Sequence, residues 1–309
     1  MRAAAIVGLG VPPSELKPFQ ANVDADWQMG LPDSSGGVDV VLLLGGDGTL
    51  HRHLGQLVEL KLPVLVVPCG SGNDFARALG MLKTADALAA WRKFVSGANN
   101  VRSVDLGVIT PLGMEPGDGS AAKLSGPSAG NVGSKGKRYF SCVSGVGLDG
   151  EIARRANRLP RWLRAHGGYA LSLPGALAGF RSPRLKVMER PGDEAGAWKV
   201  QSDQPTLLAA FANTAVYGGG MKVAPRALMD DGLLDICVIE NVSALRVLRL
   251  FHLVYSGRHT GLKEVKYFQA AGARVEAESR LEVYADGEFV CQTPVEIGVA
   301  PGALRVVAP

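Results

Sequence analysis

Residues 41–49 are Val41-Leu42-Leu43-Leu44-Gly45-Gly46-Asp47-Gly48-Thr49, and this stretch decides the fold that we predict. A short run of branched apolar residues is typical of a buried parallel strand. After it, apolar positions 50, 54, 57 and 58 recur at helical spacing. A strand, a glycine turn and a helix together place an anion at the helix N-terminus, so we expect a nucleotide or phosphate site. The alternative is an ordinary tight turn between a strand and a helix.

A second unit of the same kind follows. Residues 62–67 are nearly all branched and apolar, and they lead into Pro68-Cys69-Gly70-Ser71-Gly72-Asn73-Asp74-Phe75. Two consecutive units of strand, glycine loop and helix predict a doubly wound α/β layer, with both loops at the carboxyl edge of the sheet. We also expect a first strand near residues 3–7 and a helix over residues 85–95.

The character of the chain changes after residue 101. A strand is predicted over 103–109, and residues 111–137 are rich in Gly, Ser and Pro, which indicates a surface loop. Short strands at 139–146, 184–189, 206–213, 233–239, 273–277, 281–285, 289–292 and 295–299 predict an antiparallel sandwich. Helical insertions are expected at 150–157 and 244–255. The predicted fold is therefore an N-terminal α/β doubly wound domain, residues 1–102, followed by a mainly β-sandwich domain, residues 103–299, with 300–309 rejoining the first.

Composition limits the class of protein. The chain has 309 residues, of which 47% are hydrophobic and 20% charged, as in soluble globular proteins. A net charge of +4 suits anionic ligands or an anionic membrane surface. The four cysteines form no CxxC pair, which favours a reducing cytoplasm over a disulfide or metal framework. No apolar run is long enough for a membrane span, and the apolar segment 3–11 is too short for a signal peptide.

The candidate metal ligands and the candidate general base of the chain are carboxylates. The sequence lacks both a Walker A lysine motif and the protein-kinase catalytic set. Phosphoryl transfer by another fold still needs a nucleotide cradle, a divalent ion and a base. Candidates to hold magnesium are Asp47, Asp74, Asp105, Asp230, Asp231 and Asp235. Asp286-Gly287 predicts a hairpin turn, and Glu288 begins the returning strand. By composition alone Glu288 would be an ordinary solvated carboxylate.

Together these residues resemble the diacylglycerol kinase catalytic family, in its soluble bacterial lipid-kinase branch. The resemblance begins with the two glycine loops and continues in the same order to the C-terminus. The further matching pieces are Val104-Asp105-Leu106-Gly107, Ser144-Gly145-Val146-Gly147-Leu148-Asp149, Ala212-Asn213, Gly218-Gly219-Gly220-Met221-Lys222-Val223-Ala224-Pro225, Asp230-Asp231-Gly232-Leu233-Leu234-Asp235 and Asp286-Gly287-Glu288. The first motif is shared with NAD kinases, whereas the loop at Asn73 and the run at Asp230 are more specific.

The resemblance implies ATP-dependent phosphorylation of a lipid hydroxyl, such as that of diacylglycerol, in a cleft between the two domains. It implies Glu288 as the general base. The nucleotide-binding residues that it implies are Gly45, Gly46, Asp47, Gly48, Thr49, Leu50, His51, Gly70, Ser71, Gly72 and Asn73. A structural Mg²⁺ site is implied at Asp231 with the carbonyls of Leu228 and Leu233, linked through water to Asp105 and Asp47. The chain departs from the family at Gly8-Leu9-Gly10, where an Asn-Pro loop is usual, and at His51-Arg52, where Asn-Glu is frequent.

Two other functions stay open on the sequence: a NAD-kinase-like or other small-alcohol kinase, and a catalytically silent nucleotide- or lipid-binding protein. Partners expected are a lipid alcohol and an anionic membrane surface met peripherally, with no nucleic acid; a homodimer is left open. The basic segment that contains Arg154, Arg155, Arg158, Arg161 and Arg164 surrounds Leu159, Trp162 and Leu163. Such a segment could rest on lipid headgroups, or form a solvated helix with an apolar underside.

Overall fold

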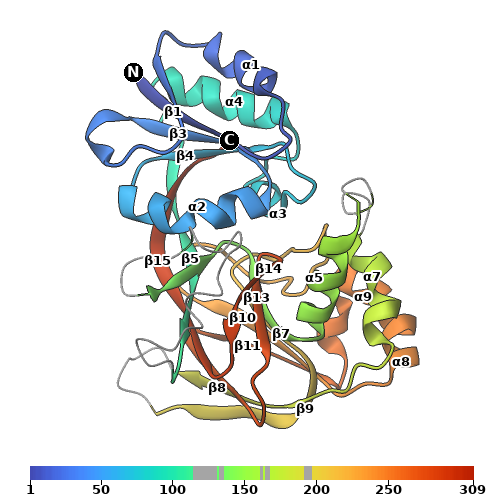
Figure 1. Cartoon of the computed structure of the whole chain (residues 1–309). Coiled ribbons are helices and arrows are strands. Elements are labelled where there is room, and N and C mark those ends of the chain that lie inside the picture. The colour runs from blue at the N-terminus through green and yellow to red at the C-terminus, as the bar shows by residue number, and fades with distance from the viewer. Residues whose placement is uncertain (114–130, 132–135, 161–162, 164–167, 191–196) are drawn as a thin grey trace.

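The computed structural model describes residues 1–113, 131, 136–160, 163, 168–190 and 197–309. An α/β domain and a β-rich domain are connected by two long strands, β5 (Val101–Pro111) and β15 (Val295–Val307), as Figure 1 shows. The loop predicted over 111–137 falls mostly outside the described residues. Arg161, Trp162 and Arg164 of the predicted basic segment also lie outside them.

The first domain is built on a parallel sheet, as predicted. Its strands are β1 (Arg2–Val7), β2 (Asp26–Met29), β3 (Val40–Gly45) and β4 (Val64–Pro68), in the order β2-β1-β3-β4. The end of β15 lies parallel to β4, where Val306 pairs with Val64. We did not predict β2, because three of its four residues are exposed and it has no apolar pattern.

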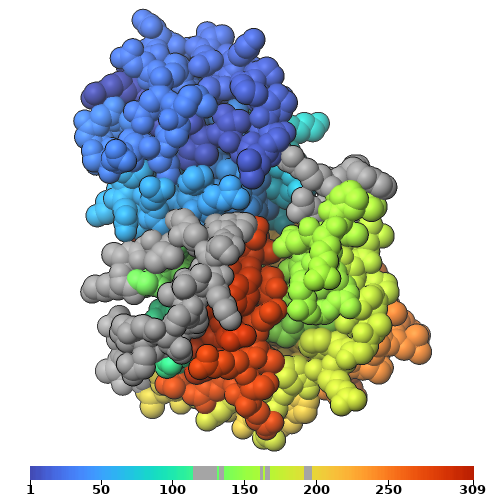
Figure 2. Space-filling model, viewed as in Figure 1, coloured from blue at the N-terminus to red at the C-terminus, as the bar shows by residue number. Residues whose placement is uncertain are grey.

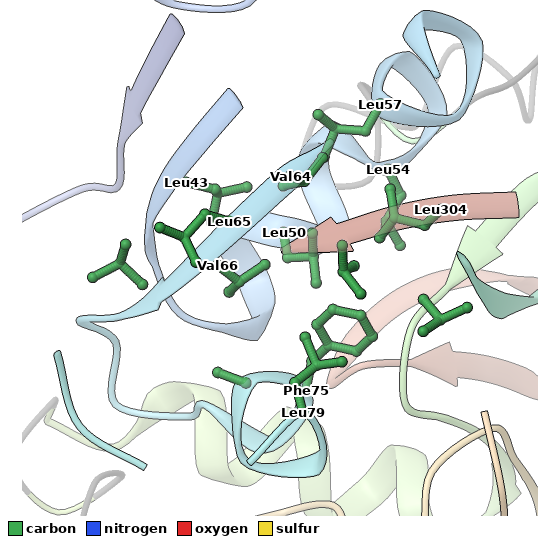
Figure 3. Packing of buried hydrophobic residues seen from close by; sticks show 14 of the residues in the cluster. Leu43, Leu50, Leu54, Leu57, Val64, Leu65, Val66, Phe75, Leu79 and Leu304 are labelled. Carbon is green, nitrogen blue, oxygen red and sulfur yellow. The ribbon is translucent and has the colours of Figure 1, made fainter. Parts of the chain in front are cut away.

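Helices cover both faces of this sheet. On the face away from the second domain lies α1 (Lys17–Gln20) with α4 (Thr84–Val95), and on the facing side lie α2 (Asp47–Leu60) and α3 (Asp74–Ala78), as Figure 1 shows. Short 3-10 turns occupy Pro13–Leu16 and Ser35–Gly37. In Figure 3, Leu50, Leu54 and Leu57 project from one side of α2 into the core shared with β4 and β15. Their helical spacing therefore fixes which side of α2 is buried.

Two sheets pack face to face in the second domain, which confirms the predicted sandwich. One follows the order β6-β5-β15-β12-β8-β9 and the other β14-β13-β7-β9-β10-β11, so β9 belongs to both. Between them lies a core that includes Ile109, Phe140, Phe211, Ile236 and Val283. The strands are β6 (Arg138–Phe140), β7 (Val143–Gly147), β8 (Arg184–Arg190), β9 (Lys199–Ala212), β10 (Leu234–Glu240), β11 (Val265–Ala270), β12 (Gly272–Ala277), β13 (Glu282–Ala285) and β14 (Glu288–Gln292).

Helices gather on one side of the sandwich (Figure 1). They are α5 (Leu148–Arg158), α7 (Gly168–Leu177), α8 (Ala244–Leu250) and α9 (His252–Ser256), followed by the 3-10 turn η6 (Arg258–Gly261). The predicted insertions near 150–157 and 244–255 are confirmed. We did not predict α7, because it contains Pro174 and begins at Gly168; contacts of Leu173 and Leu177 with Ile152 in one apolar cluster stabilise it. Among the described residues, no helix combines the length and apolar character needed to cross a membrane.

Candidate active site

The two glycine loops meet at the carboxyl edge of the first sheet. Gly45 at the end of β3 pairs with Pro68 at the end of β4, and the Asp47 N–H donates to Gly72 O at 3.1 Å. A Cβ on Gly70 would lie 2.4 Å from Gly46 Cα, and one on Gly46 would lie 2.2 Å from Gly72 O. Only glycine permits this approach. The glycines are therefore required for contact between the loops, besides any role in phosphate binding.

Asp47 links the two loops through its carboxylate. Its oxygens accept hydrogen bonds from the Asp74 N–H at 2.9 Å and the Phe75 N–H at 3.1 Å, so it caps the start of α3. Burial, reinforced by the negative charges of Asp74 and Asp286, raises the pKa of Asp47 to about 7. The negatively charged form of Asp47 is therefore unfavourable in this environment, and a bound cation would stabilise it.

Asp74 extends this network to the second domain. Asp74 Oδ2 accepts a hydrogen bond from the Gly219 N–H at 3.0 Å, and burial raises the pKa of Asp74. Asp74 Oδ1 is buried and accepts no hydrogen bond from the described residues; it forms an ion pair with Arg77 Nε at 3.7 Å. A buried carboxylate oxygen of this kind is a fitting ligand for Mg²⁺.

The hairpin turn between β13 and β14 brings the predicted base to the loops. Asp286 and Gly287 both have positive φ, 51° and 83°, as a two-residue hairpin turn requires. Asp286 accepts hydrogen bonds from the Ser141 and Cys142 N–H groups, both at 2.8 Å. Glu288 follows, and its Oε1 lies 3.4 Å from the position that a Cβ on Gly48 would occupy. Glu288 therefore lies against the first turn of α2, in the other domain.

A cavity of about 520 Å³ lies between the domains, and the glycine loops, Asp47, Asp74, Asp286 and Glu288 all line it. The size is typical of a small-molecule site, and the N-terminus of the 14-residue helix α2 opens into it. Its lining includes nine of the predicted nucleotide-binding and catalytic residues: Gly46, Asp47, Gly48, Thr49, Gly70, Ser71, Gly72, Asn73 and Glu288. Both glycine loops and the Glu288 carboxylate of the second domain thus line one cleft.

Three predicted nucleotide-binding residues lie outside the lining of this cavity. Gly45 ends β3 against Thr49, Leu50 is fully buried in the core, and His51 is fully buried and contacts Asp286. Of the unusual pair His51-Arg52, Arg52 lines the cavity. Any contribution of His51 to nucleotide binding would therefore act through Asp286.

Sequence reasoning missed several residues that line the cleft. They include Arg77, Tyr169, Tyr217, Gly218 and Asp286. The run Gly218-Gly219-Gly220, with positive φ at all three residues, was the available signal for a loop that approaches another backbone. Arginines in an otherwise carboxylate-rich cleft add positive charge, which suits a polyphosphate.

A second, apolar cavity adjoins the cleft. It is lined by α5, α7, α8 and α9 and by the residue between the last two, through side chains that include Ile152, Leu173, Val247, Phe251 and Val254. Tyr169 and Tyr217 line both cavities and form the boundary between them. Their rings pack edge to face at 5.4 Å, and both hydroxyls donate to Asp149 Oδ1. Burial raises the pKa of Asp149. The boundary between the two cavities is thus a fixed polar cluster.

The predicted structural metal residues lie outside the lining of the cleft. Asp105 is buried and accepts hydrogen bonds from the Gly232 and Gly302 N–H groups at 2.8 and 2.7 Å. Burial, with the carboxylates of Asp235 and Asp105, raises the pKa of Asp231. None of these three carboxylates forms an ion pair with a described Lys or Arg. Within the described chain, no group of three or more His, Cys, Asp or Glu side chains has metal-binding geometry.

Backbone oxygens can also bind a metal ion, and together with the carboxylate of Asp231 they make the turn at Asp231 a suitable Mg²⁺ site. A Mg²⁺ ion prefers carboxylate, carbonyl and water oxygens, and the turn at Asp230-Asp231-Gly232 offers carboxylate and carbonyl groups next to Asp105. The negative charges of Asp235 and Asp105 beside Asp231 favour a cation there.

Comparison with known proteins gives two family-model matches that together cover most of the chain. Residues 28–109 match the diacylglycerol kinase catalytic domain, and residues 142–308 match the YegS C-terminal NAD kinase beta sandwich-like domain. A diacylglycerol kinase of Mycobacterium tuberculosis is 34% identical over 275 residues, covering 88% of this chain and 78% of that protein. A probable lipid kinase YegS-like protein of Chromohalobacter salexigens is 29% identical, covering 89% and 78%.

Solved structures share the fold. A putative diacylglycerol kinase from Bacillus anthracis has a TM-score of 0.70 at 19% identity, covering 100% of this chain and 97% of its own. A NAD kinase from Archaeoglobus fulgidus in complex with ATP has a TM-score of 0.51 at 13% identity, covering 99% and 93%. The fold alone does not separate these two kinds of kinase, but the sequence matches do. The chain belongs to the diacylglycerol kinase catalytic family and is a phosphotransferase of that class.

Proposed function

We propose that the enzyme transfers the γ-phosphoryl group of ATP to the hydroxyl of a lipid alcohol such as diacylglycerol. The observation that carries the proposal is the junction of two cavities at Tyr169 and Tyr217. One cavity holds glycine loops and a carboxylate, as phosphoryl transfer requires, and the other is apolar. A lipid alcohol has the same two parts, a polar hydroxyl and an apolar chain.

In this proposal each lining group has one role. The glycine loops and the N-terminus of α2 bind the phosphates. Glu288 accepts the proton of the lipid hydroxyl as that oxygen bonds to the γ-phosphorus and the bond from the γ-phosphorus to the bridging oxygen of ADP breaks. Asp286 positions Glu288, since its carboxylate is fixed by the backbone of Ser141 and Cys142. Arg52 and Arg77 stabilise the charge on the phosphates.

We propose Mg²⁺ at two places. Asp231, with the carbonyls of Leu228 and Leu233 and the nearby Asp105, would hold a structural ion. Asp74 Oδ1, which accepts no hydrogen bond from the described residues, would hold the ion that accompanies ATP, close to Asp47. When bound, that ion would supply neutralisation of charge on the transferred phosphoryl group.

We further propose a cytoplasmic enzyme that meets its substrate at a membrane surface, in agreement with four free cysteines. The decisive experiment is incubation of the purified protein with labelled ATP and Mg²⁺, with diacylglycerol, a total lipid extract or NAD as acceptor. We expect labelled phosphatidic acid with diacylglycerol and no labelled product with NAD. Labelled NADP without labelled lipid, or no transfer to any acceptor, would overturn the proposal.

A further inference from the structure

Helices α8 and α9 are rich in apolar residues, yet neither contains a buried residue. Leu245 is 79% exposed and Leu248 is 44% exposed. Residues three and four apart lie on the same side of a helix, so Leu245, Leu248 and Arg249 share one side of α8, which we call the α8 face. In Figure 2 the orange atoms of this region project at the side of the molecule. Two exposed leucines on one helical turn are a surface that water does not favour.

The opposite side of the same helices forms the wall of the apolar cavity. Val247, Leu250, Phe251 and Val254 line it. Val247 and Phe251 also pack against the apolar cluster formed by α5 and α7. Helix α8 itself therefore lies between the apolar cavity and the exposed α8 face.

The charge on this segment has one sign. Between Asn241 and Lys263 the sequence contains Arg246, Arg249, Arg258 and Lys263 and no Asp or Glu. Arg246 pairs with Glu264 at 2.9 Å, whereas Arg249 forms no ion pair with a described residue. Helix α5 differs, because Arg154 and Arg155 both pair with Glu151. Exposed leucines beside unneutralised cations are complementary to an anionic bilayer, whose interior is apolar and whose surface is negative.

We infer that the α8 face inserts into the headgroup region of an anionic lipid bilayer, so that the apolar cavity opens toward the lipid from which the substrate is drawn. Leu245 and Leu248 enter the boundary between headgroups and acyl chains, and Arg249 contacts anionic headgroups. The inference rests on the proposed lipid-kinase function for its purpose. The observations behind it, however, are the exposed residues of α8, and membrane binding by these residues can be measured without catalysis.

The test is sedimentation of the full-length protein with vesicles of phosphatidylcholine alone or mixed with phosphatidylglycerol. We expect the wild type to bind the anionic vesicles. Replacing both leucines, Leu245→Asp with Leu248→Asp, should weaken this binding by about tenfold or more, because apolar burial is lost and repulsion added. Arg249→Gln should weaken binding to anionic vesicles by about fivefold and leave binding to neutral vesicles unchanged.

Matched controls lie in the other domain. Leu82→Asp changes a leucine that is 62% exposed, and Lys17→Gln removes one exposed cation. Both should bind as the wild type does, and thermal unfolding should show that every variant is folded. Vesicle binding by the double variant equal to that of the wild type would overturn the inference. Light scattering provides a second test. If the wild type is a dimer and the double variant is a monomer that still binds vesicles, a second copy of the chain covers the α8 face and the inference is overturned.

Activity separates this inference from the proposed function. With a short-chain diacylglycerol dispersed in water, the double variant should phosphorylate at the wild-type rate, and with vesicle-embedded diacylglycerol it should be slower by about tenfold. Vesicle binding without transfer to any lipid would overturn the proposed function and leave the α8 face intact. Equal rates on both substrates in the double variant would overturn the α8 face alone.

Discussion

His51 Nδ1 lies 3.2 Å from Asp286 Oδ2, and both side chains are fully buried although 235 residues separate them. His51 is on α2 of the first domain, and Asp286 is in the hairpin turn of the second. Asn131 Nδ2 lies 3.2 Å from His51 Nε2. Asn131 is a donor there, so these partners place the histidine hydrogen on Nδ1, where it donates to Asp286. The pair thus fixes the turn that carries Glu288 against the helix that begins at the glycine loop.

Replacing His51 by Ala should therefore affect stability and catalysis together. The variant leaves a buried Asp286 oxygen with one donor fewer, and we expect a loss of about 1–3 kcal/mol in the free energy of unfolding. Activity should fall more than the KM for ATP changes, because the turn rather than the phosphate loop is loosened. Urea unfolding and steady-state kinetics measure the two effects. The control is His53→Ala on the same helix, which is only partly buried; equal effects at both positions would refute the link.

Glu288→Gln should abolish turnover while ATP still binds. The amide keeps the shape of the side chain but cannot accept the proton, and loss of a general base typically reduces kcat by about 10²–10⁴-fold. Calorimetric titration with ATP should give a Kd close to that of the wild type. Glu282→Gln at the other end of the same hairpin is the control, because Glu282 accepts a hydrogen bond from Tyr284 and does not line the cleft. Full activity in Glu288→Gln would remove this residue from the mechanism.

Asp47 should make the protein less stable as the pH rises. Its pKa is raised from 3.8 to about 7 on folding, so over this interval the folded chain binds more protons than the unfolded chain. The free energy of unfolding should therefore fall across the interval, by at most about 1.4 kcal/mol per pH unit, and level off above it. Urea unfolding of Asp47→Asn across the same range should give a shallower slope. Asp33→Asn, at an exposed position, should keep the wild-type slope.

Mg²⁺ should stabilise the wild type and should not stabilise Asp231→Ala to the same extent. A ligand at a hundredfold excess over its Kd raises the free energy of unfolding by about 2.7 kcal/mol. We expect a higher Tm with Mg²⁺ than with EDTA for the wild type and a smaller difference for the variant, together with lower activity. The control is Asp33→Ala, at an exposed position of the first domain, which should respond to Mg²⁺ as the wild type does. An identical melting curve for Asp231→Ala under both conditions and with wild-type Tm would argue against a structural ion.

The sequence predicts the elements whose signals are local. Strands β3 and β4 are uninterrupted apolar runs, and their glycine loops could be placed at one sheet edge because parallel strands end together. Helix α7 could not be predicted, because Pro174 and Gly168 oppose a helix locally and its stability comes from contacts with α5. The contacts of the Asp286 carboxylate could not be predicted from the sequence either. Asp-Gly indicates a turn, but which backbone and which histidine meet that carboxylate depends on how the two domains pack.

The apolar cavity was also unpredictable from the sequence, since its wall is assembled from separate helices, and we expect it to hold the acyl chain of the substrate. Val247→Trp should fill part of the cavity from α8 and exclude part of the acyl chain. Because each buried methylene contributes about 0.8 kcal/mol, loss of two or three should raise the KM for long-chain diacylglycerol by about tenfold or more. The KM for ATP should not change, because Val247 does not line the cleft. Val200→Trp, at a 49% exposed position on β9, controls for the added bulk. A raised KM for ATP with an unchanged KM for the lipid would mean that this cavity does not receive the acyl chain.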